Sequence, residues 1–350
     1  MPCENRSFRL HAAGVTRFHD EPSVTPGPGD VVLEMLSVGV CRSDIDYWVD
    51  GRIGDAIVNE PIILGHEFSA RVAEVGPGVD PALVGRRMAV EPAISCMRCE
   101  WCLRGDVNLC PTVTFCGTPP HNGALVRYRT HPAAFMAALP EMISDDAGAV
   151  LEPLAIGLHV LDLARPRLAA AGAFVGVGPV GLSILQAARA AGMGRMIALD
   201  RLPWRLDLAA TMGATDAVNA DREDPVAAVM RLTGNRGVDY VFEAGGTDDS
   251  IRLAIRVAAP GGKVFLVGIP PSDRIEFSAA IARRRGLTVY VVRRSRNTLH
   301  RALEMLAHGR LDADRLVTHR FPFAQGARAF EVAHTYADNP VKVIIRVNEQ

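Results

Sequence analysis

One glycine-rich segment sets the architecture of this chain: Val175-Gly176-Val177-Gly178-Pro179-Val180-Gly181. It has the pattern G-x-G-x-x-G, with a strand-like run before it and a helix-like run after it. Gly176 permits a tight turn, Gly178 lets the backbone approach a pyrophosphate, and Gly181 lets the helix pack closely on the strand. The anion then lies at the first helical residues, Pro179 and Val180, where the helix dipole favours negative charge. The segment therefore predicts a dinucleotide-binding site.

Asp200 ends the next β-rich run, 19 positions after Gly181. A carboxylate at this place accepts hydrogen bonds from the ribose hydroxyls of NAD and repels the 2′-phosphate of NADP. Arg201 follows directly and weakens that preference. Arg205, one helical turn further on, is within reach of the adenine face. We therefore expect NAD as the cofactor; the alternative is an ordinary aspartate that caps the next helix.

Around this segment, short β-rich runs alternate with helical windows from about residue 173 onward. The expected strands are 173–177, 196–200, 216–218, 239–242, 263–267 and 287–291, and the expected helices include 180–191, 204–212 and 250–258. Strands that alternate with helices predict βαβ units and a parallel sheet covered on both faces. Six strands of this kind predict a Rossmann domain.

The first 150 residues predict a different, mostly β domain. They contain valine-rich strands at 31–35 and 70–75, many Gly and Pro turns, and long loops. After residue 293 we expect helices at 299–307 and 324–336 and a last strand at 341–347, which return to this first domain. The predicted fold class is α/β, with residues 1–155 and 293–350 in the first domain and residues 156–292 in the inserted Rossmann domain.

Composition excludes several classes of protein. Of 350 residues, 49% are hydrophobic and 22% charged, and the net charge is −1. Nucleic-acid and membrane-surface binders usually carry a basic excess, which this chain lacks. The run 168–188 has no formal charge and is long enough to span a membrane, but four glycines and a proline interrupt it. The basic run Arg283-Arg284-Arg285 is interpreted as a solvated turn. We expect neither nucleic acid nor membrane as a partner.

Four of the seven cysteines follow the pattern C-x2-C-x2-C-x7-C: Cys96, Cys99, Cys102 and Cys110. The polar N-terminus lacks the apolar segment of a secretory signal, so we expect a reducing compartment, where clustered cysteines bind metal or react. Four thiolates so close together predict a closed, structural zinc site. A DNA-binding zinc ribbon is the alternative, but Glu91, Glu100 and Asp106 flank the cluster. No metal role is expected for Cys3 and Cys116.

A second set of metal-binding residue types is dispersed along the chain: Cys41, His66, Glu67 and Glu152. One thiolate, one imidazole and one or two carboxylates can bind zinc and leave a coordination position for water or substrate. Spacing alone does not assemble them, and each residue taken singly is more often an ordinary loop residue. The interpretation of this set depends partly on a resemblance.

With the cysteine cluster, Gly65-His66-Glu67, the glycine segment and Asp200 in this order, the chain resembles the zinc-dependent medium-chain dehydrogenases nearly from end to end. Further strings resemble the sorbitol/xylitol (polyol) dehydrogenase branch: Tyr47-Trp48-x-x-Gly51-Arg52-Ile53-Gly54, Phe115-Cys116-Gly117-Thr118-Pro119-Pro120-His121-Asn122-Gly123, Leu151-Glu152-Pro153-Leu154 and Val317-Thr318-His319-Arg320-Phe321-Pro322. The resemblance implies a GroES-like catalytic domain, two zinc ions per subunit, and a cytoplasmic homotetramer.

The resemblance also implies roles for individual residues. Cys41, His66 and Glu67 would ligate the catalytic zinc, with Glu152 as a further ligand or acting through the bound water. Asp44 would orient His66, and Ser43 would begin proton removal from the substrate hydroxyl. The substrate would be lined by Tyr47, Phe115, Thr118, Glu152 and Arg294, and the nicotinamide by Val267, Gly268 and Ile269.

Three positions depart from the branch that the chain resembles. Asp46 stands where the branch has a histidine that passes the proton to solvent. Ser295 replaces a tyrosine next to Arg294, which bears on the choice of sugar alcohol. Arg42 replaces a glycine and resembles the pyrophosphate-binding arginine of alcohol dehydrogenases, so it is expected to strengthen cofactor binding.

The expected function is hydride transfer from a polyol of the sorbitol, xylitol or L-iditol type to NAD, which gives the ketose. The first alternative is an NAD-dependent zinc dehydrogenase of another alcohol, a sugar or threonine. The second is a catalytically silent NAD-binding protein of the same fold, because a fold does not determine a function.

Overall fold

The computed structural model describes residues 5–271 and 274–349, and the chain forms two compact units. Unit 1 comprises residues 1–152 and 299–350, and unit 2 comprises residues 153–298. The predicted boundaries, after residues 155 and 292, lie three and six residues away. Unit 2 is therefore an insertion in the chain of unit 1.

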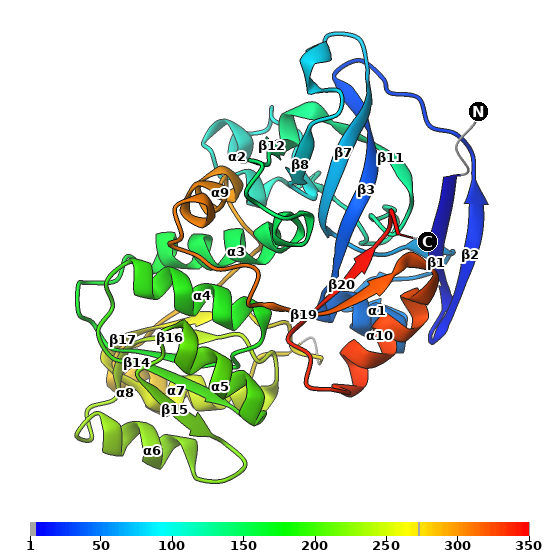
Figure 1. Ribbon diagram of the computed structural model, residues 1–350. Helices are drawn as coiled ribbons and strands as arrows, with labels where there is room; N and C mark the ends of the chain where they lie inside the picture. Colours follow the sequence, from blue (N-terminus) through cyan, green and yellow to red (C-terminus); the bar gives the residue numbers. More distant parts are fainter. Residues whose placement is uncertain (1–4, 272–273, 350) are drawn as a thin grey trace. The chain divides into compact units, whose positions relative to one another are not determined.

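Unit 2 is built on a six-stranded parallel sheet, which confirms the predicted Rossmann domain. The order is β15-β14-β13-β16-β17-β18. Its strands are β13 (Gly172–Val175), β14 (Met196–Asp200), β15 (Asp216–Asn219), β16 (Val238–Glu243), β17 (Ala258–Leu266) and β18 (Thr288–Val291). Its helices are α4 (Pro179–Ala190), α5 (Pro203–Met212), α6 (Pro225–Leu232), α7 (Asp248–Val257) and α8 (Ala279–Arg285) (Figure 1). The order reverses between β13 and β16, where such sheets bind dinucleotides.

The central strands of this sheet are mostly apolar because helices cover both faces. Phe174 of β13, Phe242 of β16 and Phe265 of β17 form a stack across three neighbouring strands, with ring centroids 5.1 and 5.5 Å apart. Each of these rings is at most 1% exposed. This stack packs β13, whose carboxyl end leads into the glycine turn, against β16 and β17.

One interpretation of the sequence was wrong in unit 2: Arg283-Arg284-Arg285 forms the last turn of helix α8 and not a turn between elements. Ser278 caps the start of this helix by accepting a hydrogen bond from the Ile281 N–H, and Gly286 ends it with φ +59°. Cations are favoured at this end by the helix dipole, which explains the basic run.

Unit 1 is mostly β, as predicted. Its large sheet has the order β12-β8-β7-β3-β20-β19, with β11 also paired to β3, and β2-β1-β6 form a smaller sheet. The strands are β1 (Asn5–Ala12), β2 (Val15–Glu21), β3 (Asp30–Val40), β6 (Ile62–Ile63), β7 (Glu67–Val75), β8 (Arg87–Val90), β11 (Tyr128–Pro132), β12 (Met136–Ala138), β19 (Val317–Pro322) and β20 (Lys342–Arg346). Two further pairs are β4 (Arg52–Ile53) with β5 (Ala56–Ile57), and β9 (Ala93–Ile94) with β10 (Thr114–Phe115).

The C-terminal segment returns to unit 1 and completes its large sheet. Figure 1 shows the red strand β20 beside the blue strand β3, and the two pair antiparallel with Val343 opposite Val40. The helices of unit 1 are α1 (Arg42–Asp50), the one-turn α2 (Glu100–Leu103), α9 (Leu299–Ala307) and α10 (Gly326–Thr335). The expected helices at 299–307 and 324–336 correspond to α9 and α10.

Helix α3 (Asp145–Ala164) begins in unit 1 and continues into unit 2. Among residues 5–271 and 274–349, it is the one helix long and apolar enough to cross a membrane, but 83% of its apolar window is buried inside the protein. The uncharged run 168–188 forms β13, the glycine turn and α4 instead of one helix. Helix α3 and the run 168–188 are therefore both interpreted as core segments of the folded protein.

Candidate metal and cofactor sites

Three residues predicted for the catalytic metal converge in unit 1. Cys41 follows β3 and is the N-cap residue of α1, while His66 directly precedes β7 and Glu67 is the first residue of that strand. The pairing of β3 with β7 sets Glu67 opposite Gly39 and so brings the two segments together. The potential ligand atoms of Cys41, His66 and Glu67 all lie within 4.8 Å of one another. A thiolate, an imidazole and a carboxylate in this arrangement are a fitting donor set for zinc.

Asp44 lies behind this group and is 1% exposed. Its Oδ1 is 3.5 Å from Nδ1 of His66, and its carboxylate accepts hydrogen bonds from the N–H groups of Cys41 and Gly65, both at 3.0 Å. Burial alone would raise the pKa of Asp44, but His66 and these hydrogen bonds lower it. Because Nδ1 of His66 faces Asp44, Nε2 is the nitrogen left for a metal.

Glu152 lies in α3 and is 7% exposed. Its carboxyl group is outside the 4.8 Å group formed by Cys41, His66 and Glu67. Burial raises the pKa of Glu152 to about 8, with a further contribution from Glu67 and opposing ones from His66 and Lys342. Glu152 therefore belongs to the same electrostatic environment as the three, and its carboxyl group can carry a proton near neutral pH.

Lys342 in β20 is a site residue that the sequence analysis missed. Its Nζ donates to Oε1 and Oε2 of Glu67 at 2.7 and 2.6 Å, and to the carbonyl oxygen of Val40 at 3.2 Å. The side chains of Lys342 and Glu67 are 2% and 1% exposed. A lysine inside the apolar run 341–347 was a signal that a buried partner exists, since lone ammonium groups are rarely buried. Nothing in the sequence alone indicates which carboxylate is that partner.

The remaining predicted residues of unit 1 lie on elements that flank the metal group. Helix α1 carries Ser43 and Tyr47 besides Asp44, and Tyr47 is buried. The ring of Phe115, in β10, is 5.2 Å from the ring of His66 between centroids. Thr118 follows in the loop after β10, and its N–H donates to the Phe115 carbonyl oxygen at 3.2 Å.

Arg42, predicted to meet a pyrophosphate, is paired with Asp46 in this structure. The Arg42 Nε donates to Asp46 Oδ1 at 2.7 Å, and the Arg42 side chain is 66% exposed. Arg294 and the buried Ser295 lie in unit 2, outside the unit that carries the metal group. The substrate roles of Arg294, Tyr47, Phe115 and Thr118 stay predictions.

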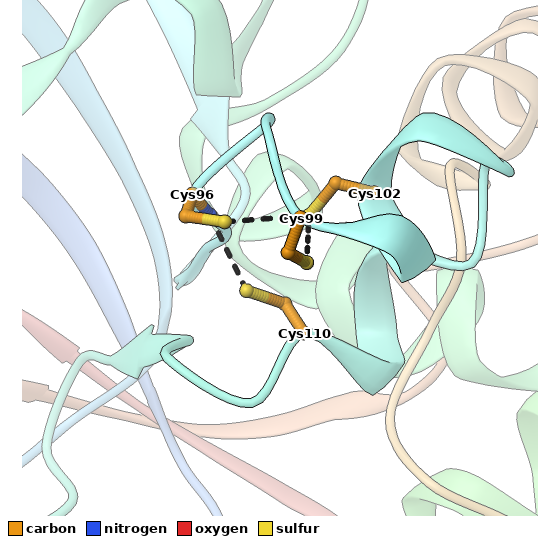
Figure 2. Close-up of side chains that lie close together, drawn as sticks. All are labelled: Cys96, Cys99, Cys102 and Cys110. Carbon is orange, nitrogen blue, oxygen red and sulfur yellow. Dashed lines mark hydrogen bonds between the residues drawn. The ribbon is translucent and has the colours of Figure 1, made fainter.

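The four clustered cysteines converge in a lobe around α2. Figure 2 shows the side chains of Cys96, Cys99, Cys102 and Cys110 pointing toward a common centre. The sulfur of Cys102 is 4.0 Å from that of Cys96 and 3.5 Å from that of Cys99. A tetrahedral zinc with Zn–S bonds of about 2.3 Å requires S···S distances of about 3.8 Å. The four thiols therefore fit a closed zinc site with no open position.

The pKa values of the thiols in this cluster differ, and the difference favours a bound cation. Backbone N–H groups, first that of Arg98 and then that of Cys99, lower the pKa of Cys96 to about 6. The N–H of Cys102 acts in the same direction on Cys99, but burial and the neighbouring thiols raise the pKa of Cys99 to about 11. Neighbouring thiols thus oppose full ionisation of the cluster, and a divalent cation removes that conflict.

The glycine segment of unit 2 forms the tight turn that the sequence predicted. Gly176 has φ +84°, and a Cβ on it would meet the backbone of Gly245 at the end of β16. A Cβ on Gly181 would collide with the carbonyl oxygen of Gly176, so helix α4 can pack this closely only with glycine there. Gly178 is the N-cap residue of α4, with Pro179 and Val180 in its first turn.

Asp200 ends β14 beside this turn. Its Oδ2 accepts a hydrogen bond from the Val177 N–H at 2.9 Å, and its Oδ1 accepts from the N–H groups of Arg201 and Leu202 at 2.8 and 3.0 Å. The guanidinium group of Arg205 lies 3.4 Å from where a Cβ on Gly178 would be. Arg205 is therefore a cation beside the expected pyrophosphate turn, and its contact with the adenine stays a prediction.

Comparison with known protein families matches both units. Residues 27–141 match the alcohol dehydrogenase GroES-like domain, and residues 179–315 match the zinc-binding dehydrogenase family. Curated relatives include the sorbitol dehydrogenase of Bacillus subtilis, 36% identical over 99% of each chain. The sorbitol dehydrogenase of Homo sapiens is 36% identical over 93% of this chain and 92% of its own.

Solved structures resemble the whole chain. An oxidoreductase of unknown specificity from Escherichia coli has a TM-score of 0.93 and 30% identity over 99% of this chain and 100% of its own. An E. coli alcohol dehydrogenase complexed with NADH has a TM-score of 0.90 and 25% identity over 98% and 99%. A zinc-binding dehydrogenase of Sinorhizobium meliloti bound to NADP has a TM-score of 0.89 and 28% identity over 99% and 100%.

Proposed function

Because this chain belongs to the zinc-dependent medium-chain dehydrogenases, in their polyol dehydrogenase branch, we propose that it transfers a hydride from a sorbitol-type polyol to NAD and so forms the ketose. The observation that carries the proposal is the convergence of Cys41, His66 and Glu67 in a group that can hold zinc with an open position. A catalytically silent NAD-binding protein would not require these three metal-binding residues in addition to a complete dinucleotide motif.

The chain's own residues hold the reacting groups and move one proton. Cys41, His66 and Glu67 would hold a zinc ion, whose Lewis acidity would lower the pKa of a substrate hydroxyl. Asp44 holds the His66 ring by Nδ1, and Lys342 holds the Glu67 carboxylate. Ser43 is the candidate that relays the hydroxyl proton: it would accept the substrate's proton as it passes its own to the cofactor ribose, while the carbon gives its hydride to the nicotinamide. These contacts fix the ligands before substrate arrives.

Several finer properties belong to the same proposal. Asp200 at the end of β14 favours NAD over NADP, because a 2′-phosphate there meets a carboxylate. The two converging groups support the proposal of two zinc ions per subunit, one catalytic and one structural. We further propose that xylitol and L-iditol are substrates, that the enzyme is cytoplasmic, and that it is a homo-oligomer, a tetramer by its resemblance to the branch.

The second candidate is an NAD-dependent zinc dehydrogenase of another alcohol, a sugar or threonine. Two observations favour it: Ser295 stands where the polyol branch has a tyrosine, and Asp46 is held by Arg42 where that branch has a histidine. Both changes affect groups expected at the substrate or on the proton path. Neither affects the residues that converge on the metal.

NADH formation, followed at 340 nm, tests the proposal. The substrate panel contains sorbitol, xylitol and L-iditol, together with 2,3-butanediol, threonine and simple alcohols, each with NAD and with NADP. We expect polyols with NAD to give the highest kcat/KM and metal analysis to give two zinc ions per subunit. Turnover of threonine or a simple alcohol, without any polyol, would establish the second candidate. Absence of turnover with the whole panel would contradict both.

A further inference from the structure

Glu243, the last residue of β16, has a buried carboxyl group with no role in the chemistry described above. The residue is 0% exposed, and Oε1 accepts hydrogen bonds from the Gly246 N–H and the Ser250 hydroxyl, both at 2.7 Å. Oε2 has no hydrogen-bond partner among the described residues. Burying a carboxyl group in the end of a sheet is costly, and one oxygen without a partner raises that cost.

The side chain of Glu243 holds the start of helix α7. Ser250, which donates to Glu243, also accepts a hydrogen bond from the Thr247 N–H at 2.9 Å, and Thr247 Oγ1 accepts from the Ser250 N–H at 3.1 Å. These reciprocal bonds form the capping box of α7. The carboxyl group is thus the common anchor for residues 244–250, which form the loop after β16 and the first turn of α7.

The main chain of Glu243 holds a second loop, residues 267–269 after β17. Its carbonyl oxygen accepts hydrogen bonds from the N–H groups of Val267 and Gly268 at 2.8 and 3.1 Å. Oε2 of Glu243 lies 3.1 Å from where a Cβ on Gly268 would be, and such a Cβ would collide with the Gly246 N–H. The backbones of the two loops therefore touch, with the Glu243 carboxyl group beneath the contact.

These two loops belong to the half of the sheet that receives the nicotinamide. A doubly wound sheet binds a dinucleotide across the point where the strand order reverses, one mononucleotide on each half. Here β13 and β14 carry the glycine turn and Asp200, which take the pyrophosphate and the adenosine ribose. The nicotinamide mononucleotide is therefore expected at the carboxyl ends of the strands in the other half of the sheet, which begins with β16.

We propose that Glu243 is a positioning residue for the nicotinamide half of the cofactor, because its buried carboxyl group locks residues 244–250 against residues 267–269. The inference depends on the proposed use of a nicotinamide cofactor. It adds a residue that touches neither substrate nor metal and acts only through the two loops. Loss of the anchor therefore weakens contacts to the nicotinamide while it leaves the adenosine half intact.

Binding of NADH and of ADP-ribose to the full-length protein separates positioning from general stability. ADP-ribose lacks the nicotinamide, and neither ligand requires turnover. For Glu243→Ala we expect NADH affinity to fall about tenfold, as for the loss of hydrogen bonds to a carboxylate, and ADP-ribose affinity to change by less than about threefold. Glu243→Gln keeps an oxygen acceptor for Gly246 and Ser250, so it should recover most of the NADH affinity.

Asp239→Asn is the matched control, because Asp239 also lies in β16 and its Oδ2 also accepts a backbone N–H, that of Ala171, but at the opposite end of the strand. It should leave the ratio of the two affinities unchanged. If Glu243→Ala does not fold, Ser250→Ala replaces it, with the same direction of change expected. Equal losses of NADH and ADP-ribose affinity, or no loss, would overturn the inference. A wild-type protein that binds ADP-ribose but not NADH would overturn the proposed cofactor as well.

Discussion

At the scale of single residues, we expect Asp200 to determine the choice between the two nicotinamide cofactors. Its carboxylate already accepts hydrogen bonds from three backbone N–H groups, so it is held in place at the end of β14. A fixed negative charge at this point repels a 2′-phosphate. Asp200→Ser removes the charge and keeps a hydroxyl for the ribose.

We expect Asp200→Ser to shift the NAD/NADP ratio of kcat/KM toward NADP by at least about tenfold. Arg201 keeps a cation next to this position in the variant, with its Nε 2.8 Å from Oδ1 of Asp221. The measurement is initial rate against cofactor concentration with one polyol. An unchanged NAD/NADP ratio would show that Asp200 only holds the turn. Asp207→Ser, in the following helix α5, serves as the control and should leave that ratio unchanged.

His131 makes the stability of unit 1 sensitive to acid. The side chain is 1% exposed in β11, edge-on to the ring of Phe68, and burial lowers the pKa of His131 to about 3, with a further contribution from Arg129. An unfolded chain protonates a histidine below about pH 6.5. Between pH 6.5 and 3 the unfolded state therefore binds the additional proton, and stability falls as the pH falls.

The stability difference between the wild type and His131→Leu should therefore change with pH. We expect the wild type to lose about 3 kcal/mol relative to the variant between pH 7 and pH 4, close to 1.4 kcal/mol per pH unit below 6.5. Denaturant unfolding of both proteins at several pH values measures the difference, in which all other titrating groups cancel. Parallel pH profiles would contradict a buried neutral His131.

Residue chemistry made some of the site predictable and left other parts hidden. Cys41 and His66 are residue types that bind zinc in any fold, so a resemblance could point to them. Lys342 and Glu243 are different, because a lysine or a glutamate in a strand has many ordinary uses. Their importance arises from burial and from partners that are distant in sequence, such as Glu67 for Lys342. A buried charge is recognised only when its surroundings are known.

At the scale of elements, the cysteine lobe has little packing of its own, so we expect its stability to depend on a bound metal ion. Helix α2 is a single turn, and β9 and β10 contribute two residues each. Three large apolar side chains of the lobe are exposed: Met97 (58%), Leu103 (76%) and Leu109 (44%). Segments that bury so little apolar surface obtain their stability from metal ligation.

We expect Cys102→Ser to reduce the zinc content from two ions per subunit to one and to lower the melting temperature by about 5 °C or more. Cys116→Ala is the matched control, because Cys116 is buried but stands outside the converging group. It should keep both ions. Metal analysis and thermal unfolding of the two variants supply the data, and a Cys102→Ser protein that retains two zinc ions would contradict the structural site.

The accuracy of the predicted elements follows from how local their signals are. Strand β14 was predicted with its exact bounds, because an apolar run between two turns is complete in five residues. The strand expected at 173–177 ends at Val175, since the positive φ of Gly176 already belongs to the turn. Helix α8 was mistaken for a solvated turn because its polar last turn hides the apolar residues before it.

At the scale of the whole molecule, chain order explains which sites could be derived from the sequence. The dinucleotide motif and Asp200 lie on two neighbouring strands of one unit, so their contact is local. The metal group requires β3 to pair with β7 and with β20, which joins residues 41, 67 and 342. Such long-range pairing has no signature in a single sequence, so only a resemblance could suggest part of that site.

The oligomeric state can be tested at the edge of the six-stranded sheet. Strand β18 is the last strand on one side, and Val291 at its end is 72% exposed. An exposed apolar edge strand readily pairs with another chain unless a partner covers it. We therefore expect β18 to be a contact between subunits of the proposed homo-oligomer.

Light scattering of the wild type should give a multiple of 37.6 kDa, and Val291→Lys should shift the mass toward that of one chain. A lysine at this position adds charge to an edge that must be apolar to pair. Ala217→Lys is the matched control: Ala217 is exposed in β15, the edge strand on the opposite side of the same sheet. Because both variants add one lysine to an edge strand of the same domain, a change in mass for Val291→Lys alone assigns the contact to β18. Equal masses for the wild type and Val291→Lys would place the subunit contact elsewhere.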